Sequence, residues 1–272
     1  MSSAEIIASG FAFPEGPAFD PAGNLFLVNC NSGVISRVAP EGQVSEFVNT
    51  GGVPVGLAFD RRGELFVADT GTRSILRVSP TGDIATFADR CDGEPLNGPN
   101  DLCFSPRGVV YFTDPAGSSV ESPMGGVFGV SPEGAVTRFA GGLAFPNGIA
   151  FSADGSSLFV AETGHRRILR FRLREDGSAA EMAVFAQMEG GVGPDGMAFD
   201  AGGNLYVAHF GAGAIAVFGA SGVLVRELSV GGANPTNLCF GGPGFDTLFI
   251  TEAETGTLRR LPAGARGLRL FA

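Results

Sequence analysis

The sequence predicts an all-β protein, a six-bladed β-propeller with four antiparallel strands in each blade. Three observations lead to this fold class. A short phrase built around a proline, such as FPEGPAFD at residues 13–20, occurs six times. Successive copies lie 40 to 48 residues apart, which is the length of a four-stranded propeller blade. Between the copies, β-rich runs alternate with glycine-containing turns about every ten residues.

The second repeat illustrates the four strands expected in each blade. They are GLAFD at 56–60, ELFVAD at 64–69, ILRVS at 75–79 and IATFAD at 84–89. The second strand is apolar on both faces in every repeat, as expected where a strand lies between neighbouring blades. Helical periodicity extends over ten residues nowhere in the chain, so very little helix is expected.

The six repeats follow one another without a linker, so residues 1–272 are expected to form one closed domain. Residues 4–10 and residues 267–272 both resemble the fourth strand of a blade. We expect the N-terminal segment to complete the sixth blade, because closure of the ring removes free sheet edges.

Composition excludes several classes of function. The net charge of −10 disfavours a nucleic-acid partner, and the absence of lysine excludes Schiff-base chemistry. The four cysteines show no zinc-binding spacing. The first ten residues lack the features of a signal peptide, and no stretch is long enough to span a membrane, so a cytoplasmic protein is expected.

Some positions of the repeat are constant and one is variable. The fifth residue after the proline is always Phe, and the fourth is always Ala or Cys, which is the pattern of packing positions. The residue directly after the proline differs from blade to blade: Glu15, Val55, Asn100, Asn147, Asp195 and Thr236.

Four of these variable residues carry oxygen ligands. The innermost strands begin near the propeller axis, so Glu15, Asn100, Asn147 and Asp195 are expected to converge on one point. Two carboxylates and two amides suit one hard divalent cation, with Ca²⁺ the expected ion and Mg²⁺ or Mn²⁺ as alternatives. Zn²⁺ is also possible, although the set contains no His or Cys. The alternative is that these side chains only cap turns.

Two insertions distinguish the third repeat. Residues 89–98 precede its innermost strand, and residues 115–126 separate its second and third strands. Both connections belong to the face on which the variable position lies. These loops either have a functional role or are solvent-exposed insertions without one.

The chain resembles the SMP-30/gluconolactonase/luciferin-regenerating-enzyme-like family over nearly its whole length. The likeness rests on the motifs FPEGPAF, LNGPNDLCFSPRGVVYFTDP, FPNGIAFS and GPDGMAFD. It implies that Glu15, Asn147 and Asp195 bind the cation and that Asn100 is a fourth ligand or contacts the substrate. Gly98 stands where the animal branch has an arginine that holds the sugar. This departure, together with PNDL in place of NDGK, resembles the bacterial gluconolactonase-like branch.

The resemblance implies a metal-dependent hydrolase whose partner is a small-molecule lactone. Asp195 is then the expected base for the attacking water, with Glu15 as the competitor. His209, at the end of a second strand, is either a substrate donor or a structural histidine. A non-catalytic NHL-like binding propeller remains an alternative, as does use of the same site on another ester, a phosphotriester or an isomerisation.

Overall fold

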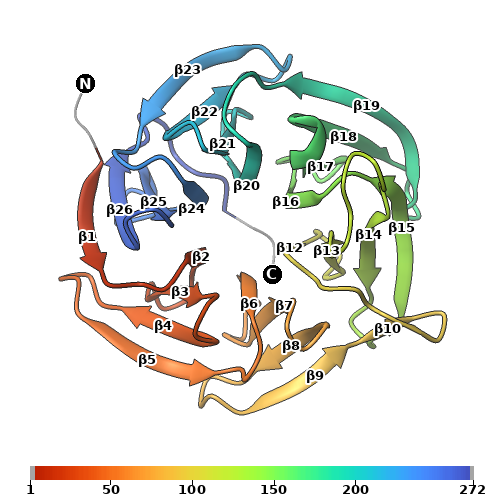
Figure 1. Ribbon diagram of the computed structural model, residues 1–272, viewed down its shortest axis with the longest axis horizontal. Helices are drawn as coiled ribbons and strands as arrows, with labels where there is room; N and C mark the ends of the chain where they lie inside the picture. Colours follow the sequence, from red (N-terminus) through yellow and green to blue (C-terminus); the bar gives the residue numbers. More distant parts are fainter. Residues whose placement is uncertain (1–3, 270–272) are drawn as a thin grey trace.

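The computed structural model describes residues 4–269 and contains six four-stranded antiparallel sheets arranged around a central axis (Figure 1). The predicted six-bladed β-propeller is therefore confirmed. In each blade the strands are added outward from the axis, and the innermost strand of each blade lies beside that of the next. The strand β24 lies beside β2, which closes the ring.

The strands are grouped here by their distance from the axis. The innermost are β2 (Pro14–Phe19), β6 (Pro54–Phe59), β12 (Leu102–Phe104), β16 (Pro146–Phe151), β20 (Gly193–Phe199) and β24 (Pro235–Gly241). The second are β3 (Leu25–Asn29), β7 (Leu65–Asp69), β13 (Val110–Asp114), β17 (Ser157–Glu162), β21 (Leu205–Phe210) and β25 (Thr247–Glu252). The third are β4 (Val34–Val38), β8 (Ser74–Val78), β14 (Gly125–Val130), β18 (Arg167–Leu173), β22 (Ala214–Phe218) and β26 (Thr257–Pro262). The outermost are β5 (Val44–Asn49), β9 (Ile84–Ala88), β15 (Val136–Leu143), β19 (Ala179–Gln187), β23 (Leu224–Ser229) and β1 (Glu5–Ser9).

The N-terminal strand closes the sixth blade, as predicted. β1 pairs antiparallel with β26 from Glu5 opposite Arg260 to Ser9 opposite Thr257. From the end of β26 to residue 269, the chain forms no fourth strand there. Instead Gly267 makes an isolated bridge with Asp200 in blade five. The last three residues of the segment predicted as a possible strand, 270–272, lie outside the described part of the chain.

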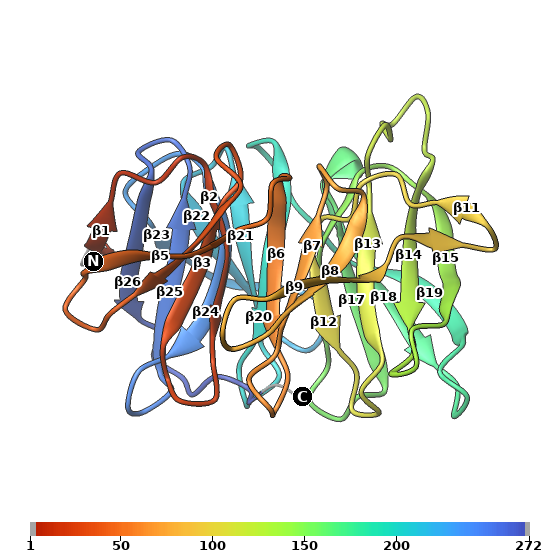
Figure 2. The same ribbon diagram turned by 90° about the horizontal axis from the view of Figure 1, so that it is seen from below.

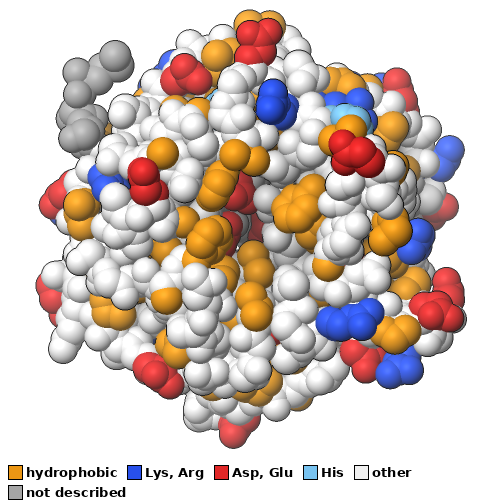
Figure 3. Space-filling view, viewed as in Figure 1, with side chains coloured by type: hydrophobic (Ala, Val, Ile, Leu, Met, Phe, Trp, Pro, Cys, Tyr) orange, Lys and Arg blue, Asp and Glu red, His pale blue; other side chains and the backbone are white. Residues whose placement is uncertain are grey.

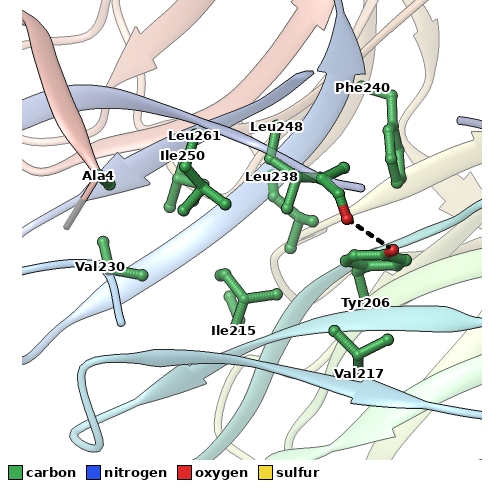
Figure 4. Close-up of a cluster of buried hydrophobic side chains, with 12 residues drawn as sticks. Ala4, Tyr206, Ile215, Val217, Val230, Leu238, Phe240, Leu248, Ile250 and Leu261 are labelled. Atoms are coloured by element: carbon green, nitrogen blue, oxygen red, sulfur yellow. Dashed lines mark hydrogen bonds between the residues drawn. The ribbon is translucent and has the colours of Figure 1, made fainter. Parts of the chain in front are cut away.

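Aromatic contacts join every pair of neighbouring blades. The constant Phe of each innermost strand packs against an aromatic ring on the second strand of the preceding blade, with centroids 5.0 to 5.3 Å apart. In blade six, Phe240 meets Tyr206, whose hydroxyl donates to the carbonyl of Ala263 at 3.3 Å (Figure 4). Such pairs add about 0.5–1.5 kcal/mol each beyond the area they bury. The repeated Phe is therefore the residue that makes six blades equivalent.

The small residue before that Phe is a packing position, as expected. Cys103 and Cys239 occupy it in blades three and six, and all four cysteines are free thiols. The one helical turn within residues 4–269 is η1 (Thr163–His165), which agrees with the expected scarcity of helix. That part of the chain contains no helix with the length and hydrophobicity needed to cross a lipid bilayer.

The two insertions take different places. Residues 89–98 contain a small hairpin, β10 (Arg90–Cys91) with β11 (Glu94–Pro95), which projects beside β15 at the periphery (Figure 2). Residues 115–126 form a loop that rises above the ring between β13 and β14 (Figure 2). The second insertion therefore stands on the face that carries the variable positions. We call this face the upper face.

Candidate functional site at the propeller axis

Each innermost strand is irregular directly after its proline. The pairing with the second strand shifts register there in blades one, two, four, five and six. In blade three, regular pairing begins only at Leu102. A β-bulge leaves a backbone N–H without a partner in the ladder and turns the side chains of the bulge in a new direction. Here the bulges aim the first and second residues after the proline toward the axis.

The side chains of the bulges bind the N–H groups that the ladder leaves free. The Oε2 of Glu15 accepts from the N–H of Gly16 at 2.7 Å. In the same way the Oδ1 of Asp101 accepts from the next residue at 2.9 Å, and the Oδ1 of Asn237 does so at 2.8 Å. The local backbone thus fixes each polar side chain before any ligand arrives.

Three of the four predicted ligands come together. Glu15, Asn147 and Asp195 are 4%, 7% and 7% exposed. The charge of Glu15 raises the pKa of the Asp195 carboxyl group and the amide of Asn147 lowers it, which places the three side chains close together. Asn100 is half-buried, and its backbone N–H donates to the carbonyl of Thr113 at 2.9 Å. Among the described residues, no hydrogen bond joins the side chain of Asn100 to the other three.

Two further residues belong to this cluster, and the sequence analysis did not select them. Asp101 and Asn237 occupy the second position after the proline, which is Gly in the other four blades. Both are 8% exposed, and the amide of Asn237 lowers the pKa values of the carboxyl groups of Glu15 and Asp101, which places it beside them. The departure from Gly in blades three and six was the signal that could have identified them. We call Glu15, Asp101, Asn147, Asp195 and Asn237 the axial cluster.

The carboxyl groups of the axial cluster have raised pKa values. Burial, reinforced by the charge of Asp101, raises the pKa of Glu15 to about 8. Burial raises the pKa of Asp101 to about 7. Burial and the charge of Glu15 raise the pKa of Asp195 well above its usual value. None of the ion pairs within residues 4–269 involves these three groups. The cluster therefore contains three carboxyl groups that no basic side chain pairs with in the described part of the chain.

Threonine hydroxyls from neighbouring blades hold the backbone of the site. Thr236 donates to the carbonyl of Pro14 at 2.8 Å, and Thr163 donates to that of Pro194 at 2.6 Å. In the same way the hydroxyl of Thr113 donates to the carbonyl of Asn147 at 2.7 Å. Each ligand-bearing strand is therefore positioned by the blade beside it, which keeps the site rigid. Thr236 occupies the variable position of blade six and has no carboxylate or amide. Its hydroxyl supports the backbone of blade one instead.

The residues at the ends of the second strands bind the connections that lead into the innermost strands. Oδ1 of Asp69 accepts from Val53, both carboxylate oxygens of Asp114 accept from backbone N–H groups, and Oε1 of Glu162 accepts from Ala144.

His209 has the equivalent place in blade five. It is 3% exposed, its Nε2 lies 3.1 Å from the carbonyl oxygen of Gly190, and its Nδ1 has no partner in the described structure. The contact with Gly190 orients the ring, and the substrate-binding role of His209 stays a prediction.

The axial cluster has the donor chemistry of a hard-cation site. Its carboxylate and amide oxygens match the ligands that Ca²⁺, Mg²⁺ and Mn²⁺ prefer, and a cation would offset the repulsion among the acids. Within residues 4–269 no group of three or more His, Cys, Asp or Glu side chains is placed so that it could hold a metal ion. A cation here would therefore depend on amide oxygens as well as carboxylates.

Two hollows lie near the axial cluster. On the upper face the centre is hollowed, acidic side chains lie at the bottom of the hollow and apolar side chains surround it (Figure 3). A second cavity, of about 1210 Å³, is lined by Asp101 and Asn237 together with the turns between first and second strands, such as Asp20 and Asp60. Glu15, Asn147 and Asp195 do not line it. Because three of the predicted ligands do not line this cavity, and acidic side chains lie at the bottom of the upper hollow, we place the candidate site in the upper hollow.

Comparison with known proteins places the chain in a family. Residues 13–254 match the model of the SMP-30/Gluconolactonase/LRE-like region. A gluconolactonase of Zymomonas mobilis is 34% identical over 185 residues, which are 61% of this chain and 51% of that protein. The lactonase drp35 of Staphylococcus aureus is 36% identical over 49% of this chain and 42% of its own length. The chain thus aligns with about half the length of these curated relatives.

A solved structure gives the same result over a longer range. The structure of a Xanthomonas campestris gluconolactonase superposes with a TM-score of 0.85 and 28% identity, and covers 94% of this chain and 88% of that protein. The family match spans five complete blades and the axial cluster. The chain therefore belongs to the SMP-30/gluconolactonase/LRE-like family.

Proposed function

We propose that the protein is a divalent-metal-dependent lactonase that hydrolyses the ring ester of a small lactone in the upper hollow. The observation that carries this proposal is the axial cluster, in which three buried carboxyl groups and two amides gather without a basic partner. The relatives named gluconolactonase and lactonase support the same reaction class.

Glu15, Asn147 and Asp195 would hold the cation, and Asn100 would add a ligand or contact the substrate. Ca²⁺ is the favoured ion, with Mg²⁺, Mn²⁺ and Zn²⁺ as alternatives. A bound divalent cation supplies polarisation of the ester carbonyl. Asn147 can hydrogen-bond Asp195 through its NH₂ group while its carbonyl oxygen stays free for a ligand role.

Asp195 acts as the general base. It takes a proton from the attacking water as the water oxygen bonds to the acyl carbon. The ring C–O bond then breaks, and protonated Asp195 returns the proton to the leaving ring oxygen. The product is a hydroxycarboxylic acid, and no covalent intermediate with the protein is needed. Glu15 is the alternative base, since it is equally buried and adjacent.

A pH-indicator assay with a lactone panel that includes glucono-δ-lactone tests the proposal. Asp195→Asn is expected to lower kcat/KM about 10²–10⁴-fold, because it removes a general base. EDTA is expected to abolish turnover, and added Ca²⁺ or Mn²⁺ to restore it. Asp60→Asn, which changes a buried acid in a turn at the other end of a blade, is the matched control. Full activity of the Asp195→Asn variant, or of the chelated protein, would contradict the proposal.

A further inference from the structure

The described part of the chain exposes fourteen large hydrophobic side chains, which fall into two groups. Eight lie on or next to the outermost strands, at the periphery of the ring: Ile6, Val44, Ile84, Met182, Val184, Val223, Leu224 and Val225. The other six lie on the upper face: Phe13, Val53, Val120, Met124, Phe145 and Val192. Scattered exposed apolar residues are normal, but a gathered set beside a polar site indicates a ligand surface.

Four of the six form what we call the apolar collar: Phe13, Val53, Phe145 and Val192. Each directly precedes an innermost strand, namely β2, β6, β16 or β20. They therefore stand at the entrance to the hollow, two or three residues before the first position after the proline in each blade. Because the innermost strands follow one another around the axis, blades one and four face each other. Figure 3 shows apolar side chains around the central hollow.

The two phenylalanines of the collar have an unfavourable backbone conformation. Phe13 has a φ of 60° and Phe145 a φ of 51°, in the left-handed region that bulky residues rarely adopt. The carbonyl of each accepts a backbone hydrogen bond at 3.1 Å, from Cys30 and Thr163 respectively. These rings remain 39% and 37% exposed, so burial in the core does not explain the conformation. Strain of this kind is typically retained at functional sites.

The second insertion supports the collar. The N–H of Phe145 donates to the Oγ of Ser118 at 3.2 Å, and that hydroxyl donates to the carbonyl of Leu143 at 2.6 Å. Val120 and Met124 of the same loop are 45% and 55% exposed. The loop thus fixes one collar phenylalanine and adds apolar surface beside it.

The residues directly before the prolines offer few hydrogen-bond partners to the hydroxyl groups of a sugar lactone. The residues that precede the six prolines of the repeat are Phe13, Val53, Gly98, Phe145, Gly193 and Asn234. None is charged and only one is polar. A hydroxyl that leaves water without a new hydrogen bond costs free energy, whereas an alkyl or aryl group gains from burial against such a surface.

We propose that the apolar collar selects lactones that carry an alkyl or aryl substituent, in preference to sugar lactones. This inference rests on the proposed function, because it names the substrate class of that site. The lactone ring would lie over the axial cluster, and the substituent would extend between Phe13 and Phe145. Each buried methylene improves kcat/KM by at most about fourfold.

The test compares δ-valerolactone, δ-nonalactone and glucono-δ-lactone in the same assay. The wild-type protein is expected to prefer δ-nonalactone over δ-valerolactone by roughly ten- to hundredfold in kcat/KM. The double variant Phe13→Gly/Phe145→Gly is expected to reduce that ratio about tenfold. Glycine adopts these φ values without strain, so the variant is expected to fold. The control is Phe245→Gly, which removes a phenylalanine with a φ of 54° outside the collar.

Binding is measured separately by calorimetry with a butyl-substituted δ-lactam, which resists hydrolysis. If no lactone is turned over but the lactam binds and the double variant weakens it, the proposed reaction is overturned and the collar inference is upheld. If turnover is observed with a preference for glucono-δ-lactone, or a selectivity ratio that the double variant leaves unchanged, the collar inference is wrong. Absence of lactam binding would also overturn it.

Discussion

The change Gly196→Ala tests whether the axial cluster depends on close contact between blades five and six. A Cβ at Gly196 would lie 2.0 Å from the Cγ of Asn237 and 2.1 Å from its Oδ1. An ordinary contact begins at 3.4 Å, so the side chain of Asn237 must move by about 1.4 Å. The φ of Gly196 lies outside the left-handed region, so the effect comes from this overlap alone.

The expected cost combines two effects. Overpacking a buried position costs about 1–3 kcal/mol. The displaced amide also moves away from the carboxyl groups of Glu15 and Asp101, and the net loss of such a polar interaction costs about 0.5–1.5 kcal/mol. We expect a total loss of about 2–4 kcal/mol in the free energy of unfolding. For a chain of this size that corresponds to a fall in Tm of roughly 5–15 °C.

A double-mutant cycle measured by chemical denaturation separates the overlap from other effects. In Gly196→Ala/Asn237→Gly the clash is absent, so the double variant is expected to be no less stable than Asn237→Gly alone. That result corresponds to a coupling energy of at least about 1 kcal/mol. Gly219→Ala is the control, because its Cβ would have no neighbour closer than 3.4 Å. Additive effects, or a Gly196→Ala variant as stable as the wild type, would refute this account of the packing.

Two further predictions concern thiols and closure of the ring. Burial raises the pKa values of all four thiols, but Cys30, Cys103 and Cys239 lie on or beside inner strands of the blades, whereas Cys91 lies on the peripheral strand β10, so only Cys91 is expected to react at pH 8. A colourimetric thiol assay is expected to count one reactive group, Cys91, in the native protein and four in denaturant; rapid reaction of all four in the native protein would contradict this. Deletion of residues 1–9 removes β1 and exposes the edge of β26, so it is expected to lower Tm and increase light scattering on heating. Glu5→Gln removes only an exposed ion pair with Arg260, so it is expected to leave Tm and light scattering on heating unchanged.

The repeat makes the fold predictable from sequence, because the constant Phe of each copy has the same contact in every blade. The N-terminal closure could also be predicted, since residues 4–10 copy the fourth strand of other repeats. Residues 267–272 also resemble a fourth strand in sequence. In the described part of that segment, however, Gly267 pairs with Asp200 of blade five instead of joining the sixth blade. A strand-like pattern in a short segment does not specify which sheet edge it joins.

The site was less predictable than the fold, and the bulges explain why. In a strand with strict alternation, only the first residue after the proline would point toward the axis. The second residue, which is Asp101 in blade three and Asn237 in blade six, would then be expected to point away from it. A bulge brings two consecutive residues to the same side, and no periodicity in the sequence reports it. The apolar collar was not predicted either, because nothing in the sequence reports that Phe13 and Phe145 are exposed or that their φ values are positive.

The site depends on asymmetry within a nearly symmetric ring. Six identical carboxylates at one point on the axis would repel too strongly to be buried together, while six glycines would bind nothing. The chain instead alternates between the two positions: blades one and five present an acid and then Gly, while blades three and six place Asp101 and Asn237 one residue later. The glycines are required for this, because Asn237 occupies the space above Gly196, and the Oδ1 of Asp101 lies 2.7 Å from where a Cβ of Gly56 would be. The departures at Asp101 and Asn237 therefore supply oxygen ligands to the axis, and the glycines retained in the neighbouring blades provide the space for them.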